Sequence, residues 1–251
     1  MSEESRSIII MPAHNEAENI AQVIPEIRAA VTGLDIVVID DFSDDDTAAV
    51  ARRLGAQVVR LPFNLGYGGA VQTGFKYAVQ HGYDYGVMMD ADGQHDPACV
   101  PGLLHVVQSG AADVGLGSRF LGHMEYQSSW VRRLGQALFS RLVSSATGQH
   151  FTDATSGFQA LSREVMEFFA RGNYPVDYPD ADTIMLLHYS GFRVKEVPVT
   201  IRGRIQGESM HGGLKPIYYV LKMTLSMLIV MLRQRTHMNA VRPGVTRDSL
   251  K

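Results

Sequence analysis

Residues 7–41 decide the fold and read SIIIMPAHNEAENIAQVIPEIRAAVTGLDIVVIDD. Ser7–Met11 and Leu34–Ile39 are short apolar runs rich in β-branched residues, which is the pattern of buried strands. Glu16–Val31 lies between them and repeats apolar residues at helical spacing. The segment therefore predicts a strand, a helix and a second strand in succession.

The alternation continues along the chain. Further strands are expected at Gln57–Leu61, Tyr85–Met89, Val114–Gly117 and Phe192–Val199, and further helices at Asp44–Leu54, Gly69–Gln80, Pro97–Gln108, Trp130–Ala146 and Asp182–Ser190. The regular alternation stops after residue 120, and Phe151–Leu161 is expected to contain a turn rich in Thr, Ser and Gly. Because the strands are apolar throughout, we expect an α/β fold with a mostly parallel sheet covered by helices on both faces.

Composition restricts the class of protein. A chain of 251 residues, 45% hydrophobic and 20% charged, can form one large α/β domain and is not a disordered protein. A single cysteine, Cys99, excludes an internal disulfide framework and fits a reducing compartment. The polar segment Met1–Arg6 lacks the apolar run of a secretory signal, so we expect a cytoplasmic location.

Charge is distributed unevenly. Residues 1–190 carry 12 basic and 23 acidic side chains, whereas residues 191–251 carry 11 and 3. In the basic part, Lys215–Arg235 predicts an amphipathic helix that Lys222 interrupts and that is too short to span a membrane. The helix either lies in a membrane interface or packs on the domain core or a partner subunit, and its basic flanks favour the surface of an anionic membrane. We expect no nucleic-acid partner. We therefore divide the chain into a main α/β domain at 1–212, this helix at 213–236 and a disordered tail at 237–251.

Polar loops follow the first four expected strands. They are Pro12–Glu16, Asp40–Asp41, Asn64–Gly69 and Asp90–Asp92. In open parallel sheets, ligands bind beyond the carboxyl ends of the strands, so these loops should converge on one site. Three glycines before a helix in Asn64–Gly69 would let backbone N–H groups approach a ligand, although the segment is neither a P-loop nor a dinucleotide-binding fingerprint.

The segment Asp90-Ala91-Asp92-Gly93-Gln94-His95 carries the chemistry. Two carboxylates two residues apart at the exit of a buried strand can hold Mg²⁺ or Mn²⁺, which prefer oxygen ligands and bind phosphate oxygens in their remaining positions. The alternative is a solvated acidic turn in which Asp96 caps the helix that begins at Pro97. The histidines His14, His95 and His211 lack zinc-ligand spacing.

An ordered series of motifs resembles a known family. The series is Pro12-x-x-Asn15-Glu16, Val38-Ile39-Asp40-Asp41-x-Ser43-x-Asp45-x-Thr47, Asn64-x-Gly66-x-Gly68, Asp90-Ala91-Asp92-Gly93-Gln94-His95, Ser118-Arg119-Phe120 and Asp153-x-Thr155-Ser156-Gly157-Phe158. It strongly resembles family-2 inverting glycosyltransferases over residues 6–235, and within them the dolichol- or polyprenyl-phosphate sugar transferase branch. The resemblance implies the nucleotide-diphospho-sugar transferase (GT-A) fold, an inverting single displacement and a requirement for Mg²⁺ or Mn²⁺.

The resemblance also implies roles for particular residues. The nucleotide pocket would be lined by Pro12, His14, Glu16, Asp40 and Asp41, with the backbone of Gly69 near the ligand. Asp90 would lie beside the ribose or the metal, and Asp92 and Gln94 would coordinate the metal. Arg119 would contact a phosphate of the acceptor or donor. Arg202 and Arg204 match a basic loop that closes over phosphates, a task that suits the bidentate guanidinium.

Two departures from the family pattern affect the expected chemistry. The catalytic acid of many relatives would fall at Tyr178–Asp182, where this chain offers Asp180 and Asp182 and the sequence does not choose between them. A phosphate acceptor is already ionised and needs no strong base, whereas a hydroxyl acceptor would make one of these aspartates essential. The membrane-spanning pair of some relatives is absent, so attachment would be peripheral or through a membrane partner protein.

The expected activity is transfer of a sugar from a GDP- or UDP-linked donor to a polyprenyl phosphate or another membrane-associated acceptor, by a monomer or a homo-oligomer. One alternative is a sugar-phosphate nucleotidyltransferase, but that class usually has a Gly-rich stretch with Arg and Lys after the first strand, where this chain has Pro12–Glu16. The other is a non-catalytic scaffold that retains the fold, against which the intact Asp90, Asp92 and Gln94 argue.

Overall fold

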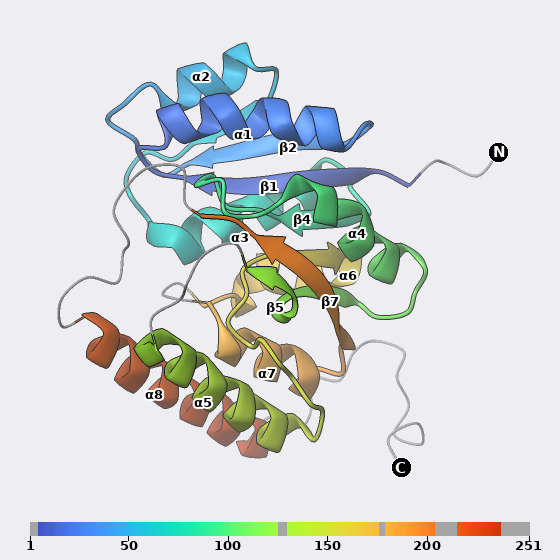
Figure 1. The fold of residues 1–251 in the computed structure, drawn as a ribbon, viewed down its shortest axis with the longest axis vertical. Coiled ribbons are helices and arrows are strands. Elements are labelled where there is room, and N and C mark those ends of the chain that lie inside the picture. The colour runs from blue at the N-terminus through green and yellow to red at the C-terminus, as the bar shows by residue number, and fades with distance from the viewer. Residues whose placement is uncertain (1–4, 125–129, 176–178, 204–214, 237–251) are drawn as a thin grey trace.

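A computed structural model describes residues 5–124, 130–175, 179–203 and 215–236 of the chain (Figure 1). The strands are β1 (Ser7–Ala13), β2 (Asp35–Asp40), β3 (Gln57–Arg60), β4 (Tyr85–Met88), β5 (Val114–Met124), β6 (Gln159–Ser162) and β7 (Val194–Ile201). The helices are α1 (Ala17–Ala30), α2 (Thr47–Arg53), α3 (Gly66–Gln80), α4 (Val100–Gln108), α5 (Trp130–Thr147), α6 (Arg163–Phe168), α7 (Ala181–Tyr189) and α8 (Lys215–Thr236). A 3₁₀ turn, Pro97–Cys99, precedes α4, and a π-helical turn, Phe169–Asn173, follows α6.

The strands form one seven-stranded sheet in the order β3-β2-β1-β4-β6-β5-β7. Neighbours pair in parallel except at β6, which is antiparallel to both β4 and β5. The α/β fold with a mostly parallel sheet is therefore confirmed. Because β1 to β4 all run the same way, their carboxyl ends lie at one edge of the sheet.

Helices cover both faces of this sheet because the strands bury both sides. In β1, Ile9 and Met11 pack with α1, α2 and α4, whereas Ile8 and Ile10 pack with α3 and the helices beyond it. Figure 1 shows α1 and α2 at one end of the molecule and α5, α7 and α8 at the other. The helix α7 contacts both α5 and α8.

The structure corrects several expected boundaries. The strand β5 continues to Met124 rather than ending at Gly117, because β7 pairs with it as far as Met124 and Ile201. The short strand β6 and the helix α6 were not expected at all. The helix α2 begins at Thr47 rather than Asp44, because Asp45 accepts the backbone N–H of Thr47 and caps the helix from outside.

The helix expected at Lys215–Arg235 is present as α8. Within the described residues, no helix combines the length and the apolar character that crossing a membrane requires. The expected tail from residue 237 onward lies outside the described residues.

Candidate active site

A pocket of about 700 Å³ lies at the carboxyl ends of the first four strands. Its walls come from all four strand-exit loops and from the first turns of α1 and α3. The convergence expected from the sequence is thus confirmed. The helix α3 begins at Gly66, earlier than expected, so Gly66 and Tyr67 belong both to the helix and to the wall of the pocket.

The loop after β1 is held in a conformation that few residues adopt. Asn15 has a φ of 55°, in the left-handed region that costs energy for any residue except glycine. The neighbouring loop compensates, because Ser43 Oγ accepts the N–H of Asn15 and Asn15 Oδ1 accepts the N–H of Asp44. His14 Nδ1 donates to the carbonyl of Asp41 over 2.8 Å. These bonds lock the loops after β1 and β2 together.

Asp40 and Asp41 face opposite ways. Asp41 lines the pocket and accepts the N–H of Leu65 over 2.7 Å, which ties the loop after β3 to the site. Asp40 is fully buried away from the pocket, where it accepts the N–H of Ser43 and lies 3.4 Å from Arg60 Nε. Consecutive side chains of an extended chain point to opposite faces, so only one of the pair can reach a ligand. Of the two residues expected in the nucleotide pocket, the structure places only Asp41 there.

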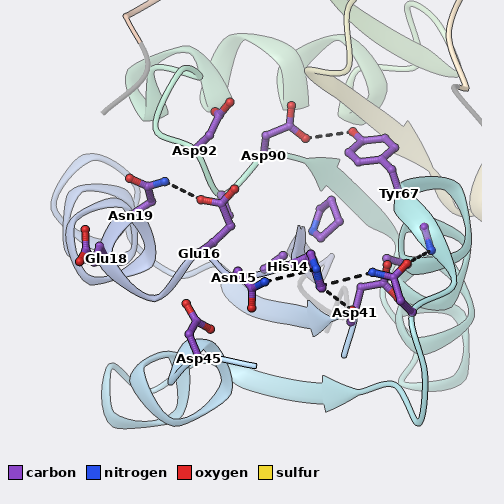
Figure 2. Close-up of a pocket in the computed structure, with 16 residues that line it drawn as sticks. His14, Asn15, Glu16, Glu18, Asn19, Asp41, Asp45, Tyr67, Asp90 and Asp92 are labelled. Carbon is purple, nitrogen blue, oxygen red and sulfur yellow. Dashed lines mark hydrogen bonds between the residues drawn. The ribbon is translucent and has the colours of Figure 1, made fainter. Parts of the chain in front are cut away.

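The turn after β4 brings its carboxylates to the pocket. Asp90 and Asp92 both line it, and Tyr67 donates its hydroxyl to Asp90 over 2.9 Å (Figure 2). Burial raises the pKa of the Tyr67 phenol, and the negative charges of Asp90 and Asp180 raise it further. Tyr67 therefore remains a hydrogen-bond donor that orients Asp90.

His95 stiffens the same turn from behind. Its ring stacks on Phe158 with centroids 4.5 Å apart, and its Nδ1 accepts the backbone N–H of Asp90 over 3.1 Å. Burial lowers the pKa of His95 to about 4, so the imidazole is neutral and carries its proton on Nε2. His95 is thus a fixed support for the strand exit.

Acidic side chains dominate the pocket. Of its sixteen lining residues, six are carboxylic acids: Glu16, Glu18, Asp41, Asp45, Asp90 and Asp92. In Figure 2 Glu16, at the start of α1, lies on the same side of the pocket as Asp92, and it accepts a hydrogen bond from Asn19. Six carboxylates in one cavity produce a strongly negative potential, which attracts cations.

The donor set at the β4 exit fits a hard divalent cation. Asp92 is only 8% exposed, yet it lines the cavity beside Asp90. One or two carboxylates with phosphate oxygens of a substrate are a usual way to hold Mg²⁺. Among the described residues, no group of three or more His, Cys, Asp or Glu is arranged as a complete metal site. Gln94 does not line the pocket, and its amide donates to the Arg202 carbonyl over 3.5 Å.

Arg119 is engaged in a buried ion pair. Its Nε and Nη2 each donate to Asp153 over 2.6 Å, and its Nη2 also donates to Thr155. Asp153 is fully buried, and Glu196 accepts its backbone N–H over 2.7 Å. The structure therefore places Arg119 outside the pocket lining, where Asp153 fixes its guanidinium.

The two aspartates near α7 occupy different environments. Asp180 precedes the helix, and its charge raises the pKa of both Tyr67 and the buried Tyr174, after burial itself. Asp182 is 1% exposed and lies in the first turn of α7. Burial raises the pKa of Asp182 above its ordinary value. Neither of the two aspartates is among the residues that line the pocket.

Arg202 and Gly69 are not among the residues that line the pocket. Arg202 forms ion pairs with Glu26 and Asp96, each at 2.8 Å, and does not line the pocket. Arg204 lies outside the described residues. Gly69 is in α3 one turn from the pocket wall, where an added Cβ would come within 2.6 Å of Leu65.

Sequence reasoning missed several pocket residues. Tyr67 lies in a segment that was singled out only for its glycines. Glu18 and Asn19 are on the first turn of α1, one turn beyond the Pro12–Glu16 loop. Asp45 accepts the N–H of Ala17, which brings α2 against α1. The signal available was their place in the sequence, since Glu18 and Asn19 lie in the first turn of the helix that directly follows the Pro12–Glu16 loop.

Comparison with known proteins agrees with this geometry. The model of glycosyl transferase family 2 matches residues 8–169, and the chain belongs to that family. A polyprenol monophosphomannose synthase from Mycolicibacterium smegmatis is 32% identical over 219 residues, covering 83% of this chain and 82% of the relative. An undecaprenyl-phosphate mannosyltransferase from Micrococcus luteus is 32% identical over 231 residues, covering 83% and 89%.

The fold has a counterpart of known structure. Glucosyl-3-phosphoglycerate synthase from Mycobacterium tuberculosis, solved with Mn²⁺ and UDP-glucose, superimposes with a TM-score of 0.68. The match covers 91% of this chain and 79% of that chain at 21% sequence identity. The chain accordingly has the GT-A fold expected from the motif series.

Proposed function

We propose that this chain is an inverting, divalent-cation-dependent glycosyltransferase that moves a sugar from a nucleotide diphosphate to a polyprenyl phosphate. The observation that carries the proposal is the acidic pocket at the β4 exit. Six carboxylates would repel a bare diphosphate, so a donor diphosphate fits there only together with a cation.

Asp92 and Asp90 are the residues that would hold the cation. When bound, Mg²⁺ or Mn²⁺ would offset the negative charge that develops on the departing nucleoside diphosphate. Tyr67 and His95 hold Asp90 in place through its side chain and backbone respectively. Gln94, the third expected ligand, would have to release Arg202 to reach the cation.

Asp41 and the locked loops after β1 and β2 would form the nucleotide end of the pocket. Polar groups presented by Pro12–Glu16 and Asn64 line that end beside the cation-binding turn. Either a GDP- or a UDP-linked donor is consistent with them.

The acceptor assignment rests on two supports. Two relatives are named as a polyprenol monophosphomannose synthase and an undecaprenyl-phosphate mannosyltransferase. In addition, α5 and α8 expose apolar side chains at helical spacing: Leu134, Leu138 and Leu142 on α5, and Leu225, Leu228, Ile229 and Leu232 on α8. Neither helix contains Asp or Glu, while both contain basic residues. Such helices suit the surface of an anionic membrane, where a lipid-linked phosphate is presented.

A transfer assay tests the proposal. Purified protein, a nucleotide-sugar panel, Mn²⁺ and undecaprenyl phosphate in anionic vesicles should yield a lipid-linked sugar, and Asp92→Asn should reduce the rate at least ~100-fold. Asp46→Asn is the matched control, because Asp46 is exposed near the site and its side chain does not cap α2. Equal rates for Asp92→Asn and Asp46→Asn, or metal-independent transfer, would exclude the proposed role of the β4 turn.

Sedimentation with vesicles tests the membrane surface. Binding should be stronger to vesicles containing phosphatidylglycerol than to pure phosphatidylcholine, and Leu228→Gln with Ile229→Gln should weaken it. Binding that does not depend on lipid charge or on these two residues would contradict the peripheral attachment.

A further inference from the structure

A buried carboxylate connects α7 to α8. One oxygen of Asp182, Oδ1, accepts the backbone N–H of Asp180 over 3.2 Å. The other, Oδ2, accepts the hydroxyl of Ser226 on α8 over 2.5 Å. Asp182 is 1% exposed, so both of its oxygens are used inside the protein and neither faces the pocket.

Ser226 lies on the inner side of an otherwise exposed helix. Met223 and Met227, its neighbours on that side, are buried, whereas Leu225 and Leu228 are exposed. The described part of α8 is therefore attached through a narrow stripe that packs on α7. The Ser226–Asp182 hydrogen bond is a polar contact within that stripe.

The other end of the connection is the start of α7. Asp180 is the N-cap of α7, and Thr183 donates its hydroxyl to the Asp180 carbonyl over 2.6 Å. Ala181, the next residue, is buried in the same hydrophobic cluster as Tyr174, and Tyr67, which lines the pocket and holds Asp90, packs against that cluster. Packed side chains thus connect the start of α7 to the cation-binding turn.

We infer that Asp182 is a positioning residue that couples the seating of α8 to the placement of Asp180. The inference builds on the proposed function, since it makes the position of the membrane-facing helix a determinant of how the site is assembled. It also gives the two aspartates near α7 different roles: Asp180 is the N-cap of the helix, and Asp182 fixes the Asp180 backbone.

Substitutions distinguish positioning from catalysis. Asp182→Asn retains an oxygen for the Asp180 N–H and an amide that can donate to Ser226, so kcat should stay within about threefold of the wild type. Asp182→Ala removes both contacts and should lower kcat at least about tenfold. Ser226→Ala should lower kcat while leaving the donor KM unchanged, and Ser226→Thr should restore it. Met231→Ala, which shortens an exposed side chain of α8 five residues away, is the control.

Amide hydrogen exchange tests the connection without an activity assay. The Asp180 amide should exchange about tenfold faster in Ser226→Ala and Asp182→Ala than in the wild type, the change expected when one hydrogen bond is lost. The Asp180 amide should exchange at the wild-type rate in Ser226→Thr, Asp182→Asn and Met231→Ala.

Two results would overturn the inference. A loss of more than about 100-fold in kcat for Asp182→Asn as well as Asp182→Ala would identify Asp182 as a proton-transferring group. Unchanged Asp180 exchange in folded Ser226→Ala would show that α8 does not communicate with Asp180. If the wild type transfers no sugar to polyprenyl phosphate, the proposed function fails, and the exchange measurement still decides the inference.

Discussion

Replacing Asp153 by Asn is expected to destabilise the protein strongly, although the two side chains have nearly the same shape. The carboxylate is fully buried and accepts three N–H groups of Arg119: the backbone N–H at 3.0 Å, and Nε and Nη2 at 2.6 Å each. The Arg119 side chain is 15% exposed, so the substitution leaves a poorly solvated guanidinium without its counterion. Breaking a buried pair from one side costs about 3–5 kcal/mol.

Urea unfolding followed by circular dichroism measures this cost. The transition midpoint should fall with little change in the denaturant slope, which reports the surface exposed on unfolding. The control is Glu167→Gln, which breaks the partly exposed i,i+4 pair with Arg163 and should cost no more than about 0.5 kcal/mol. The double variant Arg119→Gln/Asp153→Asn should lose less than the sum of the single variants. A loss below about 1 kcal/mol for Asp153→Asn would refute the assignment of Arg119 to a buried structural pair.

Three further variants test other parts of the structure. Gly74→Ala should lower the free energy of unfolding in urea by about 1–3 kcal/mol, because the added methyl group would overlap Ile10 of β1. Gly135→Ala in α5 has open space around the added methyl group and should raise the free energy of unfolding by up to about 1 kcal/mol. Tyr67→Phe should lower the free energy of unfolding by about 1–3 kcal/mol and reduce the rate of sugar transfer, since it removes the hydroxyl that holds Asp90. A Tyr67→Phe variant with wild-type activity would refute that role. Asp182→Asn should change how stability depends on pH. Burial raises the pKa of Asp182, so its favourable contribution is complete below about pH 3.8 and is lost as the pH rises through the raised value. The stability of Asp182→Asn relative to the wild type should therefore increase from pH 4 to pH 7, and a constant difference in unfolding free energy would contradict this environment.

Local sequence patterns were sufficient to predict the strands and helices of the first half of the fold. Between Ser7 and Gln108 each strand and helix has its own periodic signal, and parallel pairing follows from strands that are apolar on both faces. After residue 120 the pattern weakens. The strand β6 has only four residues, and its antiparallel place between β4 and β5 depends on partners more than 30 residues away. No local signal encodes such a partner.

The candidate site, too, could be predicted from the sequence only in part. The carboxylates Asp41, Asp90 and Asp92 follow strand ends directly, so topology alone brings them together. The direction of Asp40 and the engagement of Arg202 depend on which charged side chains lie nearby, and here Arg60, Glu26 and Asp96 do. Such pairings are decided by tertiary packing, which a motif series does not contain.

Calorimetric titration of a nucleoside diphosphate, with and without Mn²⁺, tests the central claim about the acidic pocket most directly. The wild type and Asp46→Asn should bind the nucleotide at least ~10-fold more tightly with Mn²⁺ than without it. Asp92→Asn should lose that enhancement while unfolding at the wild-type urea concentration. Tight binding without Mn²⁺, or an undiminished enhancement in Asp92→Asn, would show that the carboxylates after β4 do not hold a cation for the diphosphate.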